Sequence, residues 1–241
     1  MPYRRISFEK NQLMHVVSRA LINVFEEKKD CYLFYFQLQA INLGKRGFNI
    51  KAQDAIKAGE ALLNGEKIPE KFIIKEHPPL VYLLDHSLVV NHYHLYLLVS
   101  TPKSLISLMH RLNDSFARSY NLLQHRKDAV FGSRYKSVIV KTNFQSDAVS
   151  RYVSIINPLD VFQPGWREKG LKNPKEAFNF LKNYEFSSFP DKLGERNSQI
   201  LAPRRILEEY TPFWSDSKEY REFVKEFLEE RKTSSLPIFI E

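Results

Sequence analysis

Two histidines separated by one residue, His92 and His94, have the residue type and the spacing to bind a metal ion. They lie in an apolar stretch, 87–99, that predicts two strand segments. Successive side chains of a strand point to opposite faces, so the two imidazoles would share one face about 7 Å apart. With seven histidines in the chain, such a triple arises by chance roughly 0.2 times, so the pair alone is weak evidence. Buried imidazoles need polar partners, however, and a metal ion supplies them.

The elements that must position this pair predict an α+β fold. We expect strands at 12–21, 80–90, 93–99 and 135–140, and helices at 29–43, 50–63, 102–123 and from 143 to a stop at Asn157-Pro158. This order is that of a ferredoxin-like antiparallel sheet with helices on one face, followed by an added helix. The first and third strands are central in that topology, so the histidine pair would lie in the middle of the sheet.

Beyond residue 158 the pattern changes to loops and short helices. We therefore expect a sheet domain at 1–158, an inserted helical segment within it at about 48–79, and a mostly helical C-terminal extension at 159–241. The last helix, at 215–232, has one apolar stripe, and Asp216 with Glu219 is typical of a capping box.

The chain is basic, and its charge is unevenly distributed. The formal net charge is +8, and segment 206–232 contains eight acidic and five basic residues, so the remainder carries +11. This surplus favours an anionic partner, nucleic acid before a membrane surface. The single cysteine, Cys31, excludes an intrachain disulfide and a cysteine-based zinc cluster, and fits a reducing cytoplasm. No apolar run predicts a signal peptide or a membrane span, so we expect a cytoplasmic protein.

Several stretches, in the same order along the chain, together resemble the single-tyrosine HUH transposases, and in particular the REP-associated tyrosine transposases. They are HVVSR at 15–19, VNHYHL at 90–95, RYKS at 134–137, the pairs RY and NP within 151–158, and YEFSSF at 184–189. The match covers most of residues 1 to about 190. Its specificity lies in the ordered set, because each stretch alone is common.

The resemblance implies that Tyr152 is a nucleophile that cleaves single-stranded DNA, and that His92, His94 and Asn157 hold a metal ion. The tyrosine oxygen would attack a phosphodiester, leaving a 5′-phosphotyrosine link and a free 3′-hydroxyl. A phenol with a pKa of about 10 is a weak nucleophile at neutral pH, so the metal must help by polarising the phosphate. Nitrogen and oxygen ligands without a thiolate favour Mg²⁺ or Mn²⁺. Without the resemblance, Tyr152 would be interpreted as a helix tyrosine that buries its ring.

The family binds DNA hairpins formed by repetitive extragenic palindromes, so we expect phosphate contacts from basic side chains. The candidates are Arg4, Arg5, His15, Arg19, Arg126, Lys127, Arg134 and Lys136. For each of these side chains, a position on an ordinary solvated surface without any DNA contact is at least an equally good interpretation. For His15 and Arg19 that surface would be the exposed face of the sheet. A homodimer and a monomer are equally compatible with the sequence.

Asn157 departs from the family pattern, in which the asparagine follows the tyrosine by four positions. Here it follows Tyr152 by five, and at about 100° per residue this rotates it off the tyrosine's face. Three explanations are open: a π-bulge absorbs the extra residue, the nucleophile is another tyrosine, or the third ligand lies elsewhere. Two other functions are also open, a nucleic-acid-binding module that has lost the chemistry and a hydrolase of small phosphate esters.

Overall fold

The computed structural model describes residues 11–44, 50–67, 78–101, 103–211 and 216–232. Within these ranges four strands form one antiparallel sheet in the order β2-β3-β1-β4. The strands are β1 (Gln12–Arg19), β2 (Val81–Val89), β3 (His92–Val99) and β4 (Lys136–Val140). The first and third strands are therefore the inner ones, as the sequence predicts.

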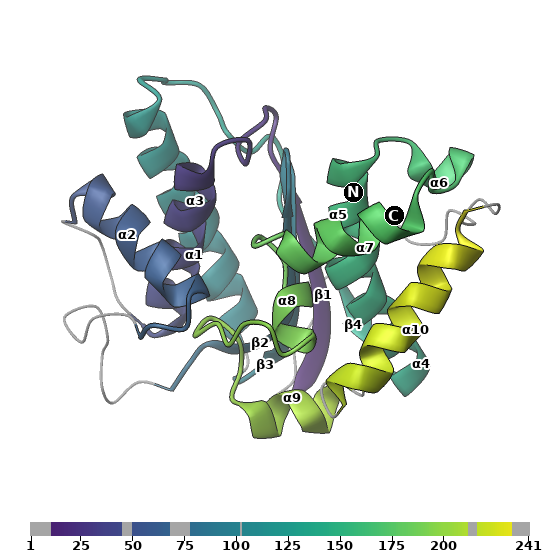
Figure 1. The fold of residues 1–241 in the computed structure, drawn as a ribbon. Coiled ribbons are helices and arrows are strands. Elements are labelled where there is room, and N and C mark those ends of the chain that lie inside the picture. The colour runs from purple at the N-terminus through teal and green to yellow at the C-terminus, as the bar shows by residue number, and fades with distance from the viewer. Residues whose placement is uncertain (1–10, 45–49, 68–77, 102, 212–215, 233–241) are drawn as a thin grey trace, which may run out of the picture.

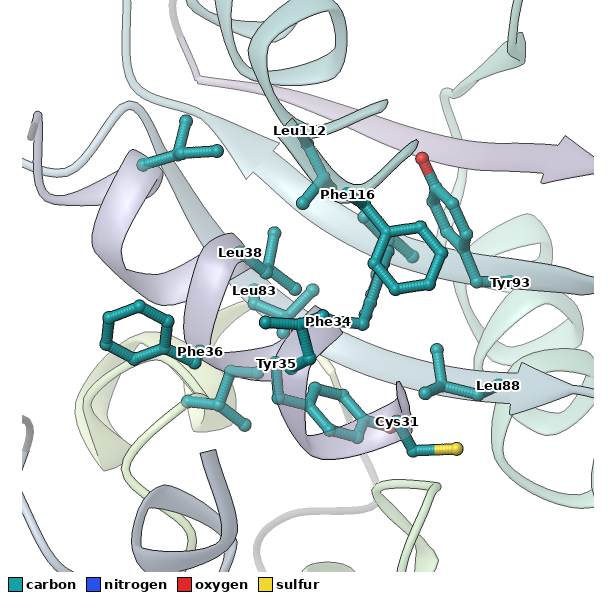
Figure 2. Packing of buried hydrophobic residues seen from close by; sticks show 14 of the residues in the cluster. Cys31, Phe34, Tyr35, Phe36, Leu38, Leu83, Leu88, Tyr93, Leu112 and Phe116 are labelled. Carbon is teal, nitrogen blue, oxygen red and sulfur yellow. The ribbon is translucent and has the colours of Figure 1, made fainter. Parts of the chain in front are cut away.

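One face of the sheet is covered by α1 (Lys28–Asn42) and α3 (Ser104–Leu123), and α2 (Ala52–Leu63) packs on α1 (Figure 1). The alternation of β3 directs Tyr93, Leu95, Leu97 and Val99 into this layer, where all four are buried. Figure 2 shows the aromatic part of this core, in which the rings of Phe34 and Tyr93 have centroids 4.6 Å apart. Each fully buried ring of this kind contributes about 2–3 kcal/mol to folding.

The segment predicted as an insertion contains α2, which packs closely on α1. A Cβ atom at Gly59 would lie 1.9 Å from the carbonyl oxygen of Tyr32, so only glycine allows this approach of the two helices. The predicted helix at 50–63 is thus confirmed with a start two residues later, and 48–49 and 68–77 lie outside the described residues. Among the described helices, none combines the length and the apolar character that crossing a membrane requires.

The expectation that helices cover one face of the sheet is wrong, because the other face is covered as well (Figure 1). On that side lie α4 (Asn143–Arg151), the π-helix η2 (Tyr152–Ile156), α5 (Asn157–Phe162), α6 (Trp166–Lys169), α7 (Pro174–Asn183), α8 (Phe189–Lys192), α9 (Arg204–Tyr210) and α10 (Ser217–Glu230). Tyr96, Leu98 and Leu84 point to this side and are buried against Val153 and Leu207. A sheet that is apolar on both faces needs cover on both.

The prediction that the helix from residue 143 stops at Asn157-Pro158 is also wrong. The helical path runs without a break through α4, η2 and α5 to Phe162, so the expected domain boundary at 158 falls inside it. In an α-helix the ring of Pro158 would clash with the carbonyl four residues earlier, and it has no N–H to donate. A turn of π-helix before the proline changes that spacing, which allows the helix to continue.

The C-terminal helix α10 confirms its apolar stripe and the Asp216 half of the predicted capping box. The side chain of Asp216 accepts hydrogen bonds from the backbone N–H groups of Lys218 and Glu219, as an N-cap does. The apolar stripe is buried against α7, α8 and the end of η2, in a cluster that includes Ile155, Leu159, Phe178, Phe189, Tyr220, Val224, Phe227 and Leu228. The C-terminal elements therefore hold the helix that contains Tyr152 from its far side.

Candidate functional site

The histidine pair lies on the sheet face that α4, η2 and α5 cover. The ring centroids of His92 and His94 are 5.1 Å apart, while Tyr93 between them points into the opposite core, as strand alternation requires. A third histidine joins them from the neighbouring strand, since Nε2 of His15 lies 3.0 Å from Nδ1 of His94. The antiparallel register of β1 and β3 places these three side chains together.

Hydrogen bonds at Nδ1 orient the two predicted metal ligands. Nδ1 of His92 lies 2.8 Å from the side-chain oxygen of Asn91. An amide oxygen can only accept, so Nδ1 of His92 has the proton and Nε2 has the lone pair. His94 uses its Nδ1 toward His15, and the tautomer in which this N–H donates leaves its Nε2 as a ligand as well. Such partners on the second nitrogen are usual for metal-binding histidines.

All three imidazoles are held in their neutral form. Burial lowers the pKa of His15 to about 4, and burial together with the nearby Arg19 and Arg167 lowers the pKa of His92 to about 4. Burial and the surrounding cationic groups lower the pKa of His94 well below its usual value. Neutral imidazole is the form that coordinates metal ions, so the pair is ready to do so at neutral pH.

Tyr152 lies over the histidines from the covering helix. Its ring is edge-on to His94, with centroids 5.4 Å apart, and edge-on to His15 at 5.9 Å. The helix contains a π turn from Tyr152 to Ile156, and the backbone N–H of Asn157 donates to the carbonyl of Tyr152. The helix therefore contains the π turn that the first of the three explanations requires. The roles of Tyr152 as nucleophile and Asn157 as ligand stay predictions.

Arg167 belongs to this site, and sequence analysis missed it. Its Nη2 donates to Oδ1 of Asn157 at 3.1 Å, its Cζ lies 5.2 Å from the centroid of the Tyr152 ring, and Nε and Nη2 both donate to Asp160. Burial opposes its charge, but hydrogen bonds to Asp160 and Tyr152 outweigh this effect and raise the pKa of the guanidinium. The only sequence signal was the turn before it, where Gly165 has a φ of 77° and reverses the chain.

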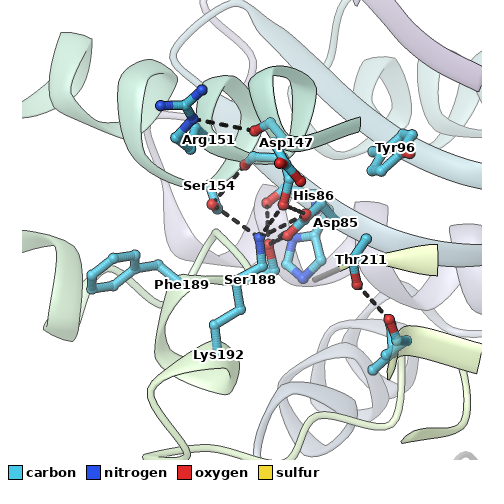
Figure 3. A network of polar contacts seen from close by, with 12 residues as sticks. Asp85, His86, Tyr96, Asp147, Arg151, Ser154, Ser188, Phe189, Lys192 and Thr211 are labelled. Carbon is cyan, nitrogen blue, oxygen red and sulfur yellow. Dashed lines mark hydrogen bonds and ion pairs between the residues drawn. The ribbon is translucent and has the colours of Figure 1, made fainter. Parts of the chain in front are cut away.

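A buried ion pair beside the site was missed as well. Nζ of Lys192 lies 2.7 Å from Oδ2 of Asp85, and both side chains are completely buried. Nζ also donates to Ser150 at 2.6 Å and to Ser154 at 3.2 Å, and Ser188 donates to the other carboxylate oxygen (Figure 3). The serines at 150 and 154 flank Tyr152 on its helix. The network therefore joins β2 and α8 to the helix that contains the tyrosine.

A β-bulge explains why alternation did not reveal this network. The register of β2 against β3 shifts between Leu83 and Asp85, so that Leu84 and Asp85 both face the covering helices. Burial lowers the pKa of Lys192 in spite of the attraction of Asp85. An ion pair of this kind needs all its hydrogen bonds, and the serines supply them.

The predicted DNA-contacting residues divide into three groups. Arg19, Lys127, Arg134 and Lys136 are exposed, and Arg126 is half-buried near an ion-pair partner, Asp128, at 3.6 Å. The expectation that His15 lies on an exposed face is wrong, because its side chain is 6% exposed and contacts His94; the covering helices bury that face. Arg4 and Arg5 lie outside the described residues.

The donor set decides which metal the site could hold. Across the described ranges, no three or more His, Cys, Asp and Glu side chains are grouped to hold a metal ion, and the amide oxygen of Asn157 stays the predicted third ligand. Two imidazole nitrogens and one amide oxygen fit Mn²⁺ or Mg²⁺. Nδ2 of Asn157 is buried without a hydrogen-bond partner in the structure, so Arg167 alone orients this amide among the described side chains.

Comparison with known proteins gives no relative. No protein-family model matches the chain. No curated protein matches it, and no solved structure matches it either. What the site does is therefore argued from its own residues.

Proposed function

We propose that this protein is a metal-dependent endonuclease and strand transferase of the single-tyrosine HUH type, which cuts single-stranded DNA near hairpins through a 5′-phosphotyrosine intermediate. One observation supports it above the others. A π turn begins at Tyr152, whose ring lies against His94, and the guanidinium of Arg167 contacts both that ring and the amide oxygen of Asn157 five residues later. π turns are rare and are frequent at functional sites, so a purely structural role explains the arrangement less well.

The sheet supports the proposal at the level of fold. Inner strands β1 and β3 and outer strands β2 and β4 match the strand order expected for a ferredoxin-like domain, and α1 and α3 are the two crossover helices. On this proposal α2 is an insertion into that fold, and the elements after β4 are an extension that covers the second face. Cys31, buried in α1, is consistent with the reducing cytoplasm that we propose as the location.

The reaction assigned to these residues is a transesterification. The phenol of Tyr152 loses its proton, its oxygen bonds to the phosphorus, and the bond from phosphorus to the 3′ oxygen breaks while that oxygen takes up a proton. The phosphotyrosine link replaces the phosphodiester, so rejoining needs no external energy source. His92, His94 and Asn157 would hold Mg²⁺ or Mn²⁺, which, when bound, polarises the phosphate.

The chain's own contribution is to position the nucleophile. The Tyr152 ring is held between the imidazoles of His94 and His15 on one side and the guanidinium of Arg167 on another. The buried network at Asp85 and Lys192 holds the helix on which the tyrosine lies. A phenol held in this way is positioned before the substrate arrives, which is worth several orders of magnitude in rate for a reaction of this type.

The test is formation of a covalent adduct between the full chain and a hairpin-containing single-stranded oligonucleotide. We expect an adduct that forms with Mg²⁺ or Mn²⁺ and is lost in Tyr152→Phe, because phenylalanine keeps the ring and removes the oxygen. Tyr210→Phe, a change in a half-buried tyrosine on α9, is the matched control and should form the adduct as the wild type does. An adduct of undiminished yield in Tyr152→Phe would remove Tyr152 as nucleophile.

A nucleic-acid-binding module without chemistry is the second candidate. Asn157 is completely buried and its oxygen accepts from Arg167, an arrangement that a protein without a metal could also have. Salt-sensitive binding to structured DNA with no cleavage in the presence of any divalent metal would select this function.

A further inference from the structure

Arg167 donates a hydrogen bond to an oxygen atom that the proposed metal site needs. The side-chain oxygen of Asn157 is the third donor of that site, and in this structure it accepts a hydrogen bond from Nη2 of Arg167 at 3.1 Å. Asn157 is completely buried, whereas the side chain of Arg167 is 26% exposed. The amide thus has no surface open to solvent, and the side chain bonded to its oxygen is a more exposed one. A metal ion that takes this oxygen must displace the guanidinium.

A second contact holds Arg167 in place when it leaves Asn157. Nε donates to Oδ1 of Asp160 at 3.0 Å, and Nη2 donates to Oδ2 of the same carboxylate. Trp166 in turn donates from its indole N–H to Oδ1 of Asp160 at 2.9 Å, so the carboxylate is itself oriented. A fork of two parallel hydrogen bonds fixes a guanidinium more firmly than one does. Nη2 donates to both Asp160 and Asn157, so the bond to Asn157 can break while Asp160 still holds the guanidinium.

Charge makes the two occupants of Asn157 mutually exclusive. A divalent cation bound to the amide oxygen would lie beside a guanidinium that donates to the same atom, and like charges repel strongly in a partly buried site. The same guanidinium lies against the Tyr152 ring and is hydrogen-bonded to the Tyr152 side chain, whose hydroxyl is where a scissile phosphate must come. Arginine binds phosphate oxygens with the same fork that it uses for carboxylates.

We propose, resting on the function proposed above, that Arg167 is a catalytic residue with two successive partners. Without metal it donates to Asn157; with metal bound it stays paired with Asp160 and donates the N–H freed from Asn157 to a non-bridging oxygen of the scissile phosphate. Arg167 keeps its proton throughout. The bond that forms joins the Tyr152 oxygen to phosphorus, the bond that breaks joins phosphorus to the 3′ oxygen, and the protons move from the phenol to solvent and from solvent to the 3′ oxygen.

The first test measures metal binding without DNA. Mn²⁺ is titrated into the full chain and free Mn²⁺ is followed by electron paramagnetic resonance. Arg167→Gln should bind Mn²⁺ severalfold more tightly than the wild type, because the competitor for Asn157 and its charge are gone. Asn157→Ala should bind about tenfold more weakly. Arg118→Gln, which removes an exposed arginine that is also paired with an aspartate, Asp114, is the matched control and should leave the affinity unchanged.

The second test measures the rate of adduct formation on the hairpin oligonucleotide at saturating Mn²⁺. Arg167→Gln should slow this rate roughly 100-fold, the usual loss when one donor to a reacting phosphate or oxyanion is removed. Arg167→Lys should recover part of the rate, since it restores the charge but not the fork. A purely structural role would weaken metal binding and reaction together, whereas this proposal requires tighter metal binding with a slower reaction.

Each outcome decides the proposal. Unchanged or weaker Mn²⁺ affinity in both Arg167→Gln and Arg167→Lys overturns the exchange at Asn157, and an unchanged adduct rate overturns the contact with phosphate. Circular dichroism melting identifies a variant that fails to fold. If either Arg167→Gln or Arg167→Lys does not fold, the measurements are interpreted from the other of these two variants. A wild-type protein that forms no adduct overturns the proposed function and the phosphate contact with it, while the Mn²⁺ titration still decides the exchange.

Discussion

The backbone N–H of Asn157 donates to the carbonyl oxygen of Tyr152, five residues earlier. In an α-helix the two side chains would be about 140° apart, since each residue turns the helix by about 100°. The π turn reduces that angle, and the guanidinium of Arg167 contacts both the Tyr152 ring, which lies against His94, and the side-chain oxygen of Asn157. The candidate site therefore depends on the π turn that this hydrogen bond closes.

Removing one residue from the π turn should leave the site intact. Deletion of Ile156, the half-buried residue of this turn, is combined with Pro158→Ala, because the proline ring would clash in an ordinary α-helix. The two changes together restore a spacing of four between the tyrosine and the asparagine. We expect the deleted protein to fold and to form the adduct within about tenfold of the wild-type rate. Deletion of Ala148 in α4 is the control, because it turns Tyr152 away from the histidines and should abolish the adduct. Loss of the adduct in both deletions would contradict this account of the π turn.

Breaking the buried ion pair should strongly destabilise the protein. Lys192→Met leaves the carboxylate of Asp85 buried without its charge partner, which should lower the free energy of unfolding by about 3–5 kcal/mol in urea denaturation. The double variant Lys192→Met with Asp85→Leu should recover most of this loss, since neither charge is then buried alone. Lys182→Met removes a partly exposed pair with Glu195 and should change the stability by less than about 1 kcal/mol. Equal losses at both lysines would show that burial of the pair is not the reason.

Stability should fall as the pH is lowered through the weakly acidic range. The pKa of His15 is about 4 in the folded protein, below its ordinary value of 6.5, because the side chain is buried. Between these two values the unfolded chain binds more protons than the folded one, so the free energy of unfolding decreases from pH 6.5 down to about pH 4. This contribution is fully present above pH 6.5.

The size of this effect is on the order of 2–3 kcal/mol for one imidazole. Urea midpoints measured in EDTA at several pH values between 4.5 and 7 should be less dependent on pH in His15→Gln than in the wild type. His110→Gln, an exposed replacement on α3, is the comparison and should follow the wild-type curve. A wild-type protein whose stability is flat over this range would contradict the burial of neutral histidines.

Divalent metal should stabilise the folded protein through the three predicted ligands. A metal ion that binds the native state alone raises the melting temperature as its concentration rises above the dissociation constant. We expect Mn²⁺ to raise the midpoint of the wild type, EDTA to reverse the shift, and His92→Ala and Asn157→Ala to lose most of it. His125→Ala, in the loop after α3, is the control and should respond as the wild type does. A shift that persists in both ligand variants would place the metal elsewhere.

The sequence by itself determined the main elements and the shared face of the histidine pair. Strand alternation has a period of two, so His92 and His94 must lie on one side whatever packs against them, and Tyr93 on the other. The apolar stripe of α10 and its N-cap at Asp216 are likewise local signals, and both are confirmed. The strand order with β1 and β3 inside follows from the order of elements along the chain.

Only the tertiary structure decided what surrounds that pair. The sequence allowed a π turn but could not require it, because the helix that contains it is joined to β2 and α8 by Ser150 and Ser154, which contact Asp85 and Lys192 far away in the chain. His15 contacts His94 through the register of two strands, and Arg167 reaches Asn157 after the chain reverses at Gly165. These contacts join residues that are far apart in the chain or lie on the two sides of a turn. Hydrophobic periodicity predicts only the face to which a side chain points and does not predict which residue it contacts there.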